Sequence, residues 1–316
     1  MFSIRNLFLT VSAAALLFTS CDKDDDNNEI KVGDKEGILL VTFGSSYEAP
    51  QATFEGIDKS AKTKFAGEEI RWGYTSDIIL NKLRQGNGEG SLKGKIIDND
   101  TPEEALKLMI EEGYGKISVQ SLHVIPGEEF DEMLETVEEI EALHEGVEIS
   151  VGKPLLNSNE DLVAVAKALA DKFSAQVAAG EPVLLMGHGT PHENDKKYAE
   201  LEVELKKLYS NFFIGTVEGI GFDKGETSIG GILTKLSALE LKSKNVTISP
   251  LMSIAGDHAN NDMNADTGES DPAEQSWRER LVTAGYKVTD VMKGLGDYNE
   301  INAIWLSHLD EAKAKL

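Results

Sequence analysis

The stretch Pro182-Val-Leu-Leu-Met-Gly-His-Gly-Thr-Pro-His192 decides which fold the chain is expected to adopt. Its apolar run, 183–186, is typical of a short buried strand, and the run stops at Gly187-His188-Gly189. Glycines on both sides let the backbone turn sharply and leave the imidazole of His188 unshielded at the strand's carboxyl end. Ligands of open α/β sheets bind at that end. His188 is therefore a candidate metal ligand and proton acceptor, and a turn histidine bonded only to backbone is the alternative.

The same alternation of strand and helix runs through the rest of the chain. Strands are expected at 37–43, 69–74, 116–122, 147–151, 183–186, 211–217, 245–252 and 286–291. Helices are expected at 52–66, 77–85, 101–113, 130–143, 159–173, 198–209, 230–241, 277–284 and 299–315. Two consecutive strand-helix series of similar length predict an α/β fold with two doubly wound, parallel-sheet (Rossmann-like) domains, 37–153 and 154–316, facing each other across a cleft.

Composition and the first residues narrow the classes of function. The net charge of -24 argues against a nucleic-acid partner, because phosphates would be repelled.

The first residues, 1–21, resemble a bacterial lipoprotein signal peptide. They contain Arg5, an apolar run at 7–18 and small residues before Cys21. That resemblance implies cleavage before Cys21 and a lipid anchor on this residue in the outer membrane; an ordinary secretory signal is the alternative. Cys21 is the only cysteine, so an internal disulfide and thiolate metal sites are excluded.

The acidic segment at 22–36 predicts a disordered tether, because it is charged and poor in apolar residues. An acidic run directly after the lipidated cysteine also resembles the surface-export signal of Bacteroidetes lipoproteins. The expected location is an exported, membrane-anchored lipoprotein of a Gram-negative bacterium, facing either the periplasm or the cell surface. The sequence is compatible with a homo-oligomer and does not decide the oligomeric state.

Three candidate metal ligands stand at consecutive strand ends of the second series: His188, Glu218 and His258. Two imidazoles and a carboxylate suit a divalent ion such as cobalt, nickel, iron or zinc, and they leave coordination positions open for a substrate. A solvated strand-end acid is the alternative for Glu218. For His258 the alternative is a loop histidine bonded to Asp257 or Asp262.

The first series offers further candidates. The turn at Ser45 and Ser46 presents backbone N–H groups and hydroxyls to an anionic group, although it lacks the glycine spacing and lysine of a phosphate loop. His123 and Glu129 fall just past the strand at 116–122, with helix N-terminal charge as the alternative for the glutamate and its neighbour Glu128. The remaining histidines are weaker candidates for the site. His144 and His308 lie on predicted helices and are expected at the surface. His192 either supports the metal ligands from behind or is a plain turn residue.

Several of these segments carry a family resemblance. They are Val41-Thr-Phe-Gly-Ser-Ser-Tyr47, Val119-Gln-Ser-Leu-His-Val-Ile-Pro-Gly-Glu-Glu129, Met186-Gly-His-Gly189, Gly256-Asp-His-Ala-Asn-Asn-Asp262 and Gly294-Leu-Gly296. In this order and spacing they resemble the anaerobic cobalt chelatases of the CbiK family, class II tetrapyrrole chelatases related in fold to ferrochelatase. The chain departs from the family in a longer stretch between Glu218 and His258, in an insert at 268–274, and in its leader.

The resemblance implies ATP-independent insertion of Co2+ into sirohydrochlorin, a step of anaerobic cobalamin synthesis, with Fe2+ or Ni2+ as alternative metals. It implies that His188 binds metal and accepts a proton, that Glu218 and His258 complete the metal site, and that Glu129 handles metal or protons. Ser45, Ser46 and His123 are the expected substrate-binding residues. Two alternatives stay open: an exported lipoprotein that binds a tetrapyrrole or metal without turnover, and a chelatase or dechelatase acting on iron or haem.

Overall fold

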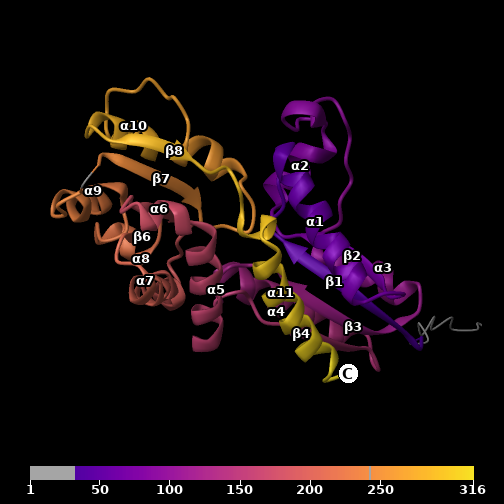
Figure 1. Ribbon diagram of the computed structural model, residues 1–316. Coiled ribbons are helices and arrows are strands. Elements are labelled where there is room, and N and C mark those ends of the chain that lie inside the picture. The colour runs from indigo at the N-terminus through magenta and orange to yellow at the C-terminus, as the bar shows by residue number, and fades with distance from the viewer. Residues whose placement is uncertain (1–32, 242) are drawn as a thin grey trace, which may run out of the picture. The chain divides into compact units, whose positions relative to one another are not determined.

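The computed structural model describes residues 33–241 and 243–316. The expected signal peptide, Cys21 and most of the tether lie outside the described residues. The first strand begins at Lys35, so the last two residues of the segment expected as tether are already part of a sheet. All eight expected strands are present within the described residues. Figure 1 shows how strands and helices follow one another along the chain.

The strands and helices alternate along the chain as the sequence predicts. The strands are β1 (Lys35–Thr42), β2 (Glu69–Tyr74), β3 (Tyr114–Ser121), β4 (Glu148–Gly152), β5 (Val183–Gly187), β6 (Phe212–Thr216), β7 (Asn245–Pro250) and β8 (Lys287–Asp290). The longer helices are α1 (Ala49–Lys64), α2 (Asp77–Arg84), α3 (Pro102–Glu111), α4 (Glu128–Leu143), α5 (Asn159–Lys172), α7 (Lys196–Leu208), α9 (Ile229–Ser237), α10 (Trp277–Thr283) and α11 (Asn299–Lys313).

The two series form two parallel four-stranded sheets with the same topology. The first has the order β2-β1-β3-β4 and the second the order β6-β5-β7-β8. In each sheet the first strand of the series therefore lies between the second and the third, and the strand order reverses beside it. The crevice outside the carboxyl ends of the strands at such a reversal is where open α/β sheets bind ligands.

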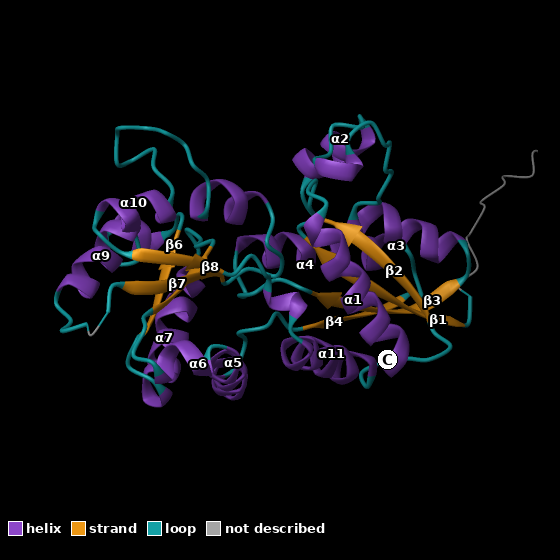
Figure 2. Cartoon of the chain, turned by 45° about the horizontal axis from the view of Figure 1, so that its top comes forward, coloured by secondary structure: helices purple, strands orange, loops and turns teal. Residues whose placement is uncertain are grey.

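Helices cover both faces of each sheet (Figure 2). Because successive strand residues point to opposite faces, Ile38 and Leu40 of β1 join one core with residues of α1 and α11, while Leu39 and Val41 join another with α3 and α4. In the second sheet Leu184 and Met186 of β5 pack with α9 and α10. The opposite face of β5 contributes to the same core as Ile38, so one apolar cluster connects the two halves of the chain.

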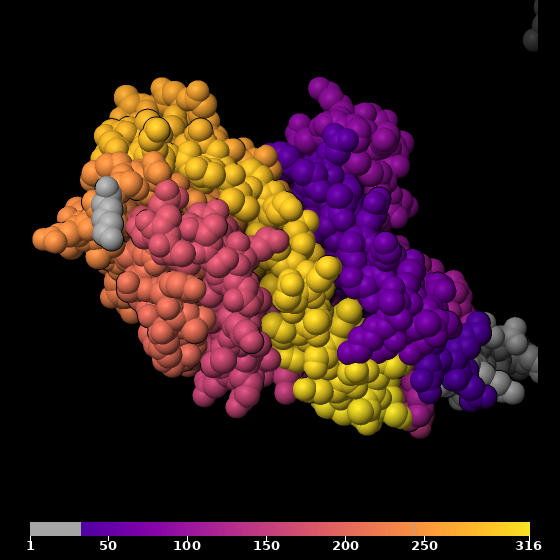
Figure 3. All heavy atoms as spheres, viewed as in Figure 1, coloured from indigo at the N-terminus to yellow at the C-terminus, as the bar shows by residue number. Residues whose placement is uncertain are grey.

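The last helix returns to the first sheet. α11 packs on β3 and β4, and Trp305 is fully buried, its indole N–H donating to the carbonyl of His123. In the space-filling view the C-terminal segment (yellow) lies between the N-terminal half (indigo) and segments of the second half (Figure 3). Residues beyond the expected boundary at 153/154 therefore help to build the first half.

This return explains why the expectation for His308 is wrong. His308 is buried, with Nδ1 3.0 Å from the carbonyl oxygen of Lys153 and Nε2 3.0 Å from Oδ1 of Asp161. From the sequence, a helix at the end of a chain is expected to have one solvated face. Here the face that carries His308 is covered, because α11 docks against the segment that connects the two halves. His144, at the end of α4, is partly exposed.

Several short helical segments were not expected, among them α6 (Ser174–Ala178), α8 (Ile220–Asp223) and a π-helix, η3 (Ala259–Met263). The π-helix begins directly after His258, where the polar run Asn260-Asn261-Asp262 indicates only a loop. Single-turn π-helices are frequent at functional sites. Among the residues described, no helix is long and apolar enough to span a membrane.

Candidate functional site

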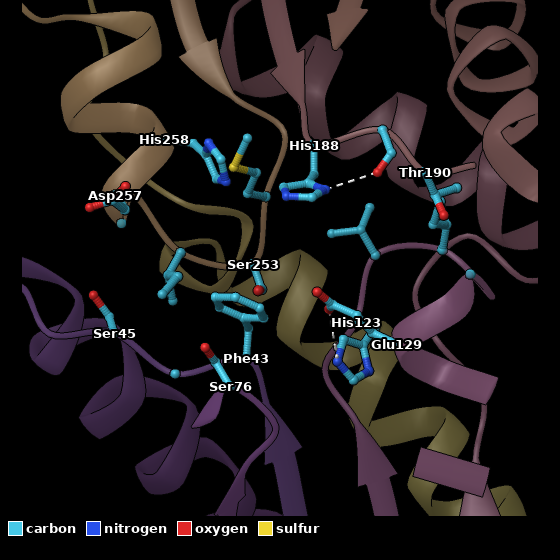
Figure 4. A pocket seen from close by; sticks show the side chains of 18 of the residues that line it. Phe43, Ser45, Ser76, His123, Glu129, His188, Thr190, Ser253, Asp257 and His258 are labelled. Atoms are coloured by element: carbon cyan, nitrogen blue, oxygen red, sulfur yellow. Dashed lines mark hydrogen bonds and ion pairs between the residues drawn. The ribbon is translucent and has the colours of Figure 1, made fainter. Parts of the chain in front are cut away.

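The carboxyl ends of strands from both sheets open into one cavity of about 380 Å³. Phe43 and Ser45, after β1, line it together with His123 after β3 and Glu129 at the start of α4. His188 after β5, Glu218 after β6 and His258 after β7 line it from the second half. In the close-up, His188 and His258 lie near each other, with Phe43 and Ser76 across the cavity and His123 beside Glu129 (Figure 4). The sequence-predicted site residues of both halves, except Ser46, therefore line one cavity.

Backbone contacts fix the turn that carries His188. The N–H of Glu218 donates to the carbonyl of His188 at 3.0 Å, which joins the ends of β5 and β6. Gly189 has φ of 93°, and a Cβ there would collide with the carbonyl oxygen of Glu218. Since L side chains rarely adopt that backbone conformation, the glycine after His188 is required by this close approach.

Asp195 also holds this turn, although its place in the sequence gives no sign of this role. Its buried carboxylate accepts the N–H of Thr190 at 3.0 Å through Oδ1 and the N–H of Gly221 at 2.9 Å through Oδ2. It therefore connects the segment after His188 to the segment after Glu218. In the polar run Glu193-Asn-Asp-Lys-Lys197 the residue looks like a solvated acid, so only the fold reveals its role.

The hydrogen bonds of the two histidines indicate which ring nitrogen is free. Nδ1 of His188 is 2.9 Å from the carbonyl oxygen of Gly189, which can only accept, so Nδ1 carries the proton. Nδ1 of His258 is 2.8 Å from Oδ2 of Asp262, and this hydrogen bond is the main cause of a raised pKa of His258. The ring centroids lie 4.7 Å apart at an interplanar angle of 77°. The Nε2 lone pair of each ring is thus left for a metal or a proton.

Glu218 approaches the same pair of rings. Its Oε1 lies 3.4 Å from Nδ1 of His188, and its side chain is 54% exposed. In the part of the chain that the structure describes, no three His, Cys, Asp or Glu side chains are already arranged to hold a metal ion. The predicted ligands thus line one cavity, and they would share an ion only after their side chains move.

His123 and Glu129 form a second titratable pair on the first-half side of the cavity. Burial lowers the pKa of His123 to about 4, so its ring is neutral at physiological pH. Its Nδ1 is 2.9 Å from Oγ of Ser121, and its Nε2 is 3.4 Å from Oε2 of Glu129. Burial, with Glu132, Glu218 and Glu128 nearby, raises the pKa of Glu129 to about 7. A carboxyl group with this pKa can give or take a proton near neutral pH.

The remaining predicted residues take different positions. Ser45 lines the cavity and its Oγ accepts the N–H of Tyr47 at 3.1 Å. Ser46 is buried and is not among the residues that line the cavity. His192 is also outside the lining: its Nδ1 accepts the N–H of Asn194 at 3.1 Å, and its Nε2 lies 3.4 Å from Asp131, so it supports a turn.

Solved structures share this fold. SirB from Bacillus subtilis subspecies spizizenii, described as a sirohydrochlorin chelatase in complex with cobalt, superposes with a TM-score of 0.58 at 14% identity, over 89% of this chain and 96% of that chain. SirB from Bacillus subtilis with Fe3+ gives a TM-score of 0.57 at 16% identity, over the same shares of both chains. At this identity the likeness concerns the fold alone, and it confirms the predicted chelatase-like α/β class.

Sequence relatives extend over nearly the whole domain. The sirohydrochlorin cobaltochelatase CbiKC of Nitratidesulfovibrio vulgaris is 32% identical over 282 residues, covering 89% of this chain and 92% of the relative. The sirohydrochlorin cobaltochelatase of Salmonella typhimurium is 30% identical over 282 residues, covering 88% of this chain and 96% of the relative. A family model described as cobalt chelatase (CbiK) matches residues 36–314. With strand ends, cavity and sequence in agreement over this span, the chain belongs to the cobalt chelatase (CbiK) family.

Proposed function

We propose that this protein is a sirohydrochlorin cobaltochelatase, which inserts Co2+ into the tetrapyrrole without ATP, as a step of cobalamin biosynthesis. Family membership and the activity named for both relatives support the assignment. The observation that carries it is the pairing of His188 and His258, whose free Nε2 atoms share one cavity with Glu129. These side chains supply nitrogens that can bind a metal and a carboxyl group that can accept a proton near neutral pH, which supports the proposal.

The reaction needs a place for the ion and an acceptor for protons. Co2+ replaces two pyrrolic N–H protons of the macrocycle, so two protons must leave for each ion that enters. Imidazole nitrogens suit Co2+, and the free Nε2 atoms of His188 and His258 can hold the ion as it loses water. Glu129, with a pKa of about 7, can accept a pyrrolic proton from within the cavity. Apolar side chains such as Phe43, Ile79 and Val124 form the surface on which a macrocycle can lie.

Anaerobic mixing of the purified protein with Co2+ and sirohydrochlorin tests the proposal. We expect catalytic metallation, followed by the absorption spectrum, with many turnovers per protein molecule. Fe2+ and Ni2+ are compared in parallel, because the same nitrogen and oxygen ligands accept them. A spectral shift that stops at one tetrapyrrole per protein would instead identify a binding protein, and metal release from haem would reverse the proposed direction.

We also propose that the chain is exported and anchored through lipid on Cys21. The leader at 1–21 and the acidic run after it support this, and both precede the region that the family model matches. Metabolic labelling with an alkyne fatty acid should mark the wild-type protein and not Cys21→Ser. A labelled Cys21→Ser variant, or an unlabelled wild type, would refute the anchor.

A further inference from the structure

The apolar part of the cavity continues onto exposed side chains of the first half. Phe43 is 39% exposed and Ile78, on α2, is 79% exposed, and both line the cavity. Exposed apolar side chains at a cavity rim are surface that a ligand can cover. Ile78, Ile79 and Lys82 all line the cavity, so one side of the short helix α2 faces it. This side of α2 is called the α2 edge.

The charges of the cavity lining are distributed unevenly. Four carboxylates line it: Glu128, Glu129, Glu218 and Asp257. Among the described lining residues, Lys82 is the one Lys or Arg. Sirohydrochlorin carries many carboxylates, and like charges brought together in a partly desolvated cavity repel each other strongly. A polycarboxylate substrate therefore has one favourable direction for its acidic side chains, toward the α2 edge.

The contacts of Lys82 leave its ammonium available for exchange. Its Nζ lies 3.4 Å from Oε1 of Glu89 and 5.7 Å from the ring centroid of Tyr47. The side chain of Lys82 is 31% exposed and that of Glu89 is 51% exposed. Such a solvated ion pair is weak, so an incoming carboxylate can replace Glu89 as its partner. Tyr47 lines the cavity beside this pair and offers a further aromatic surface.

We propose that Lys82 binds a peripheral carboxylate of the tetrapyrrole and so fixes the orientation of the macrocycle, with the bound edge at α2 and the ring nitrogens toward His188 and His258. This inference rests on the proposed function, because it takes sirohydrochlorin as the substrate. It names a specificity-determining residue: a tetrapyrrole without an acidic group at this edge loses the contact.

Equilibrium binding of metal-free sirohydrochlorin to the purified full-length chain, followed by fluorescence quenching, tests this role. Lys82→Ala should raise the Kd about tenfold at low salt, the loss expected for one charge-assisted contact. Lys82→Arg, which keeps the charge, should stay within about twofold of wild type. Lys93→Ala is the matched control, because this exposed lysine lies in the segment after α2 and outside the cavity lining. High salt should reduce the difference between wild type and Lys82→Ala.

The outcomes separate this inference from the proposed function. An unchanged Kd in Lys82→Ala, or an equal loss in Lys93→Ala, overturns the role of Lys82 even when the wild type inserts cobalt. Binding that depends on Lys82 in a wild type without turnover supports the carboxylate contact and refutes the chelatase. Because alanine is a good helix former, Lys82→Ala should fold normally, and a thermal melt verifies this.

Discussion

His188→Ala is expected to lower the kcat/KM for cobalt insertion about 10³-fold, within the range for loss of a group that transfers protons at the reacting centre. The side chain is singled out because its Nδ1 is held by the carbonyl of Gly189, which directs the lone pair to Nε2. Its ring lies 4.7 Å from that of His258. Removing it takes away one of the two imidazoles that can hold the ion, together with a proton acceptor.

The fold should survive this substitution. The turn is held by backbone groups and by Asp195, which accepts the N–H of Thr190. The imidazole of His188 contacts the carbonyl of Gly189, Glu218 and the ring of His258, and none of these contacts holds the turn. Thermal unfolding and the Kd for metal-free sirohydrochlorin should therefore be close to those of the wild type. Free imidazole added to the assay should restore part of the rate, because the substitution leaves space where the ring was.

His192→Ala is the matched control. It removes an imidazole from the same turn, but this ring bonds to Asn194, approaches Asp131 and lies outside the cavity. Its kcat/KM should stay within about threefold of the wild type, as expected for a surface turn contact. A His188→Ala enzyme as fast as this control would remove His188 from the chemistry, and with it the assignment of the metal to this side of the cavity.

The sequence allowed the strands and most of the site to be predicted, because both depend on local patterns. Apolar runs that end at glycine or at polar residues mark buried strands, and parallel strands bring their carboxyl ends to one edge of a sheet. His188, Glu218 and His258 each follow such a run, so their convergence on one cavity follows from the topology. The same reasoning placed Ser45, His123 and Glu129 at the other wall.

What the sequence could not reveal depends on contacts between distant segments. Asp195 stands in a polar run and Lys82 on the short helix α2, and in the sequence both look solvated. Only the fold makes Asp195 a buried acceptor of two N–H groups and places Lys82 at the cavity. His308 is buried because α11 returns to the first sheet. Ser46 differs from Ser45 by one position, yet only Ser45 lines the cavity. Such differences depend on packing between distant segments, which a local sequence pattern does not indicate.

Glu129→Gln is expected to lower kcat/KM about 10²-fold at pH values above 7, the second largest effect, because it removes a proton acceptor and keeps the shape of the side chain. In the wild type, burial and the carboxylates of Glu132, Glu218 and Glu128 raise the pKa of Glu129 to about 7. The acceptor is active only when ionised, so kcat/KM of the wild type should fall as the pH drops below about 7. The variant should lose this acid limb, which a pH profile of initial rates measures.

Glu132→Gln gives the matched comparison. Glu132 is exposed on α4, outside the cavity lining, and its charge is one of the causes of the raised pKa of Glu129. Removing this charge should leave the maximal rate near that of the wild type. It should move the acid limb to lower pH, because ionised Glu129 then has one negative neighbour fewer. A structural role for Glu129 predicts no such displacement.

The stability of Glu129→Gln gives an independent test with a defined sign. A raised carboxyl pKa means that the native protein binds more protons than the unfolded chain between about pH 4.5 and about pH 7, so the contribution of Glu129 to the free energy of unfolding declines across that window as the pH rises. Glutamine has no such titration. The free energy of unfolding of Glu129→Gln should therefore rise relative to that of the wild type between about pH 4.5 and about pH 7, although the variant is the slower enzyme. An acid limb that persists in Glu129→Gln would assign the titration to another group, and an unchanged rate would remove Glu129 as the proton acceptor.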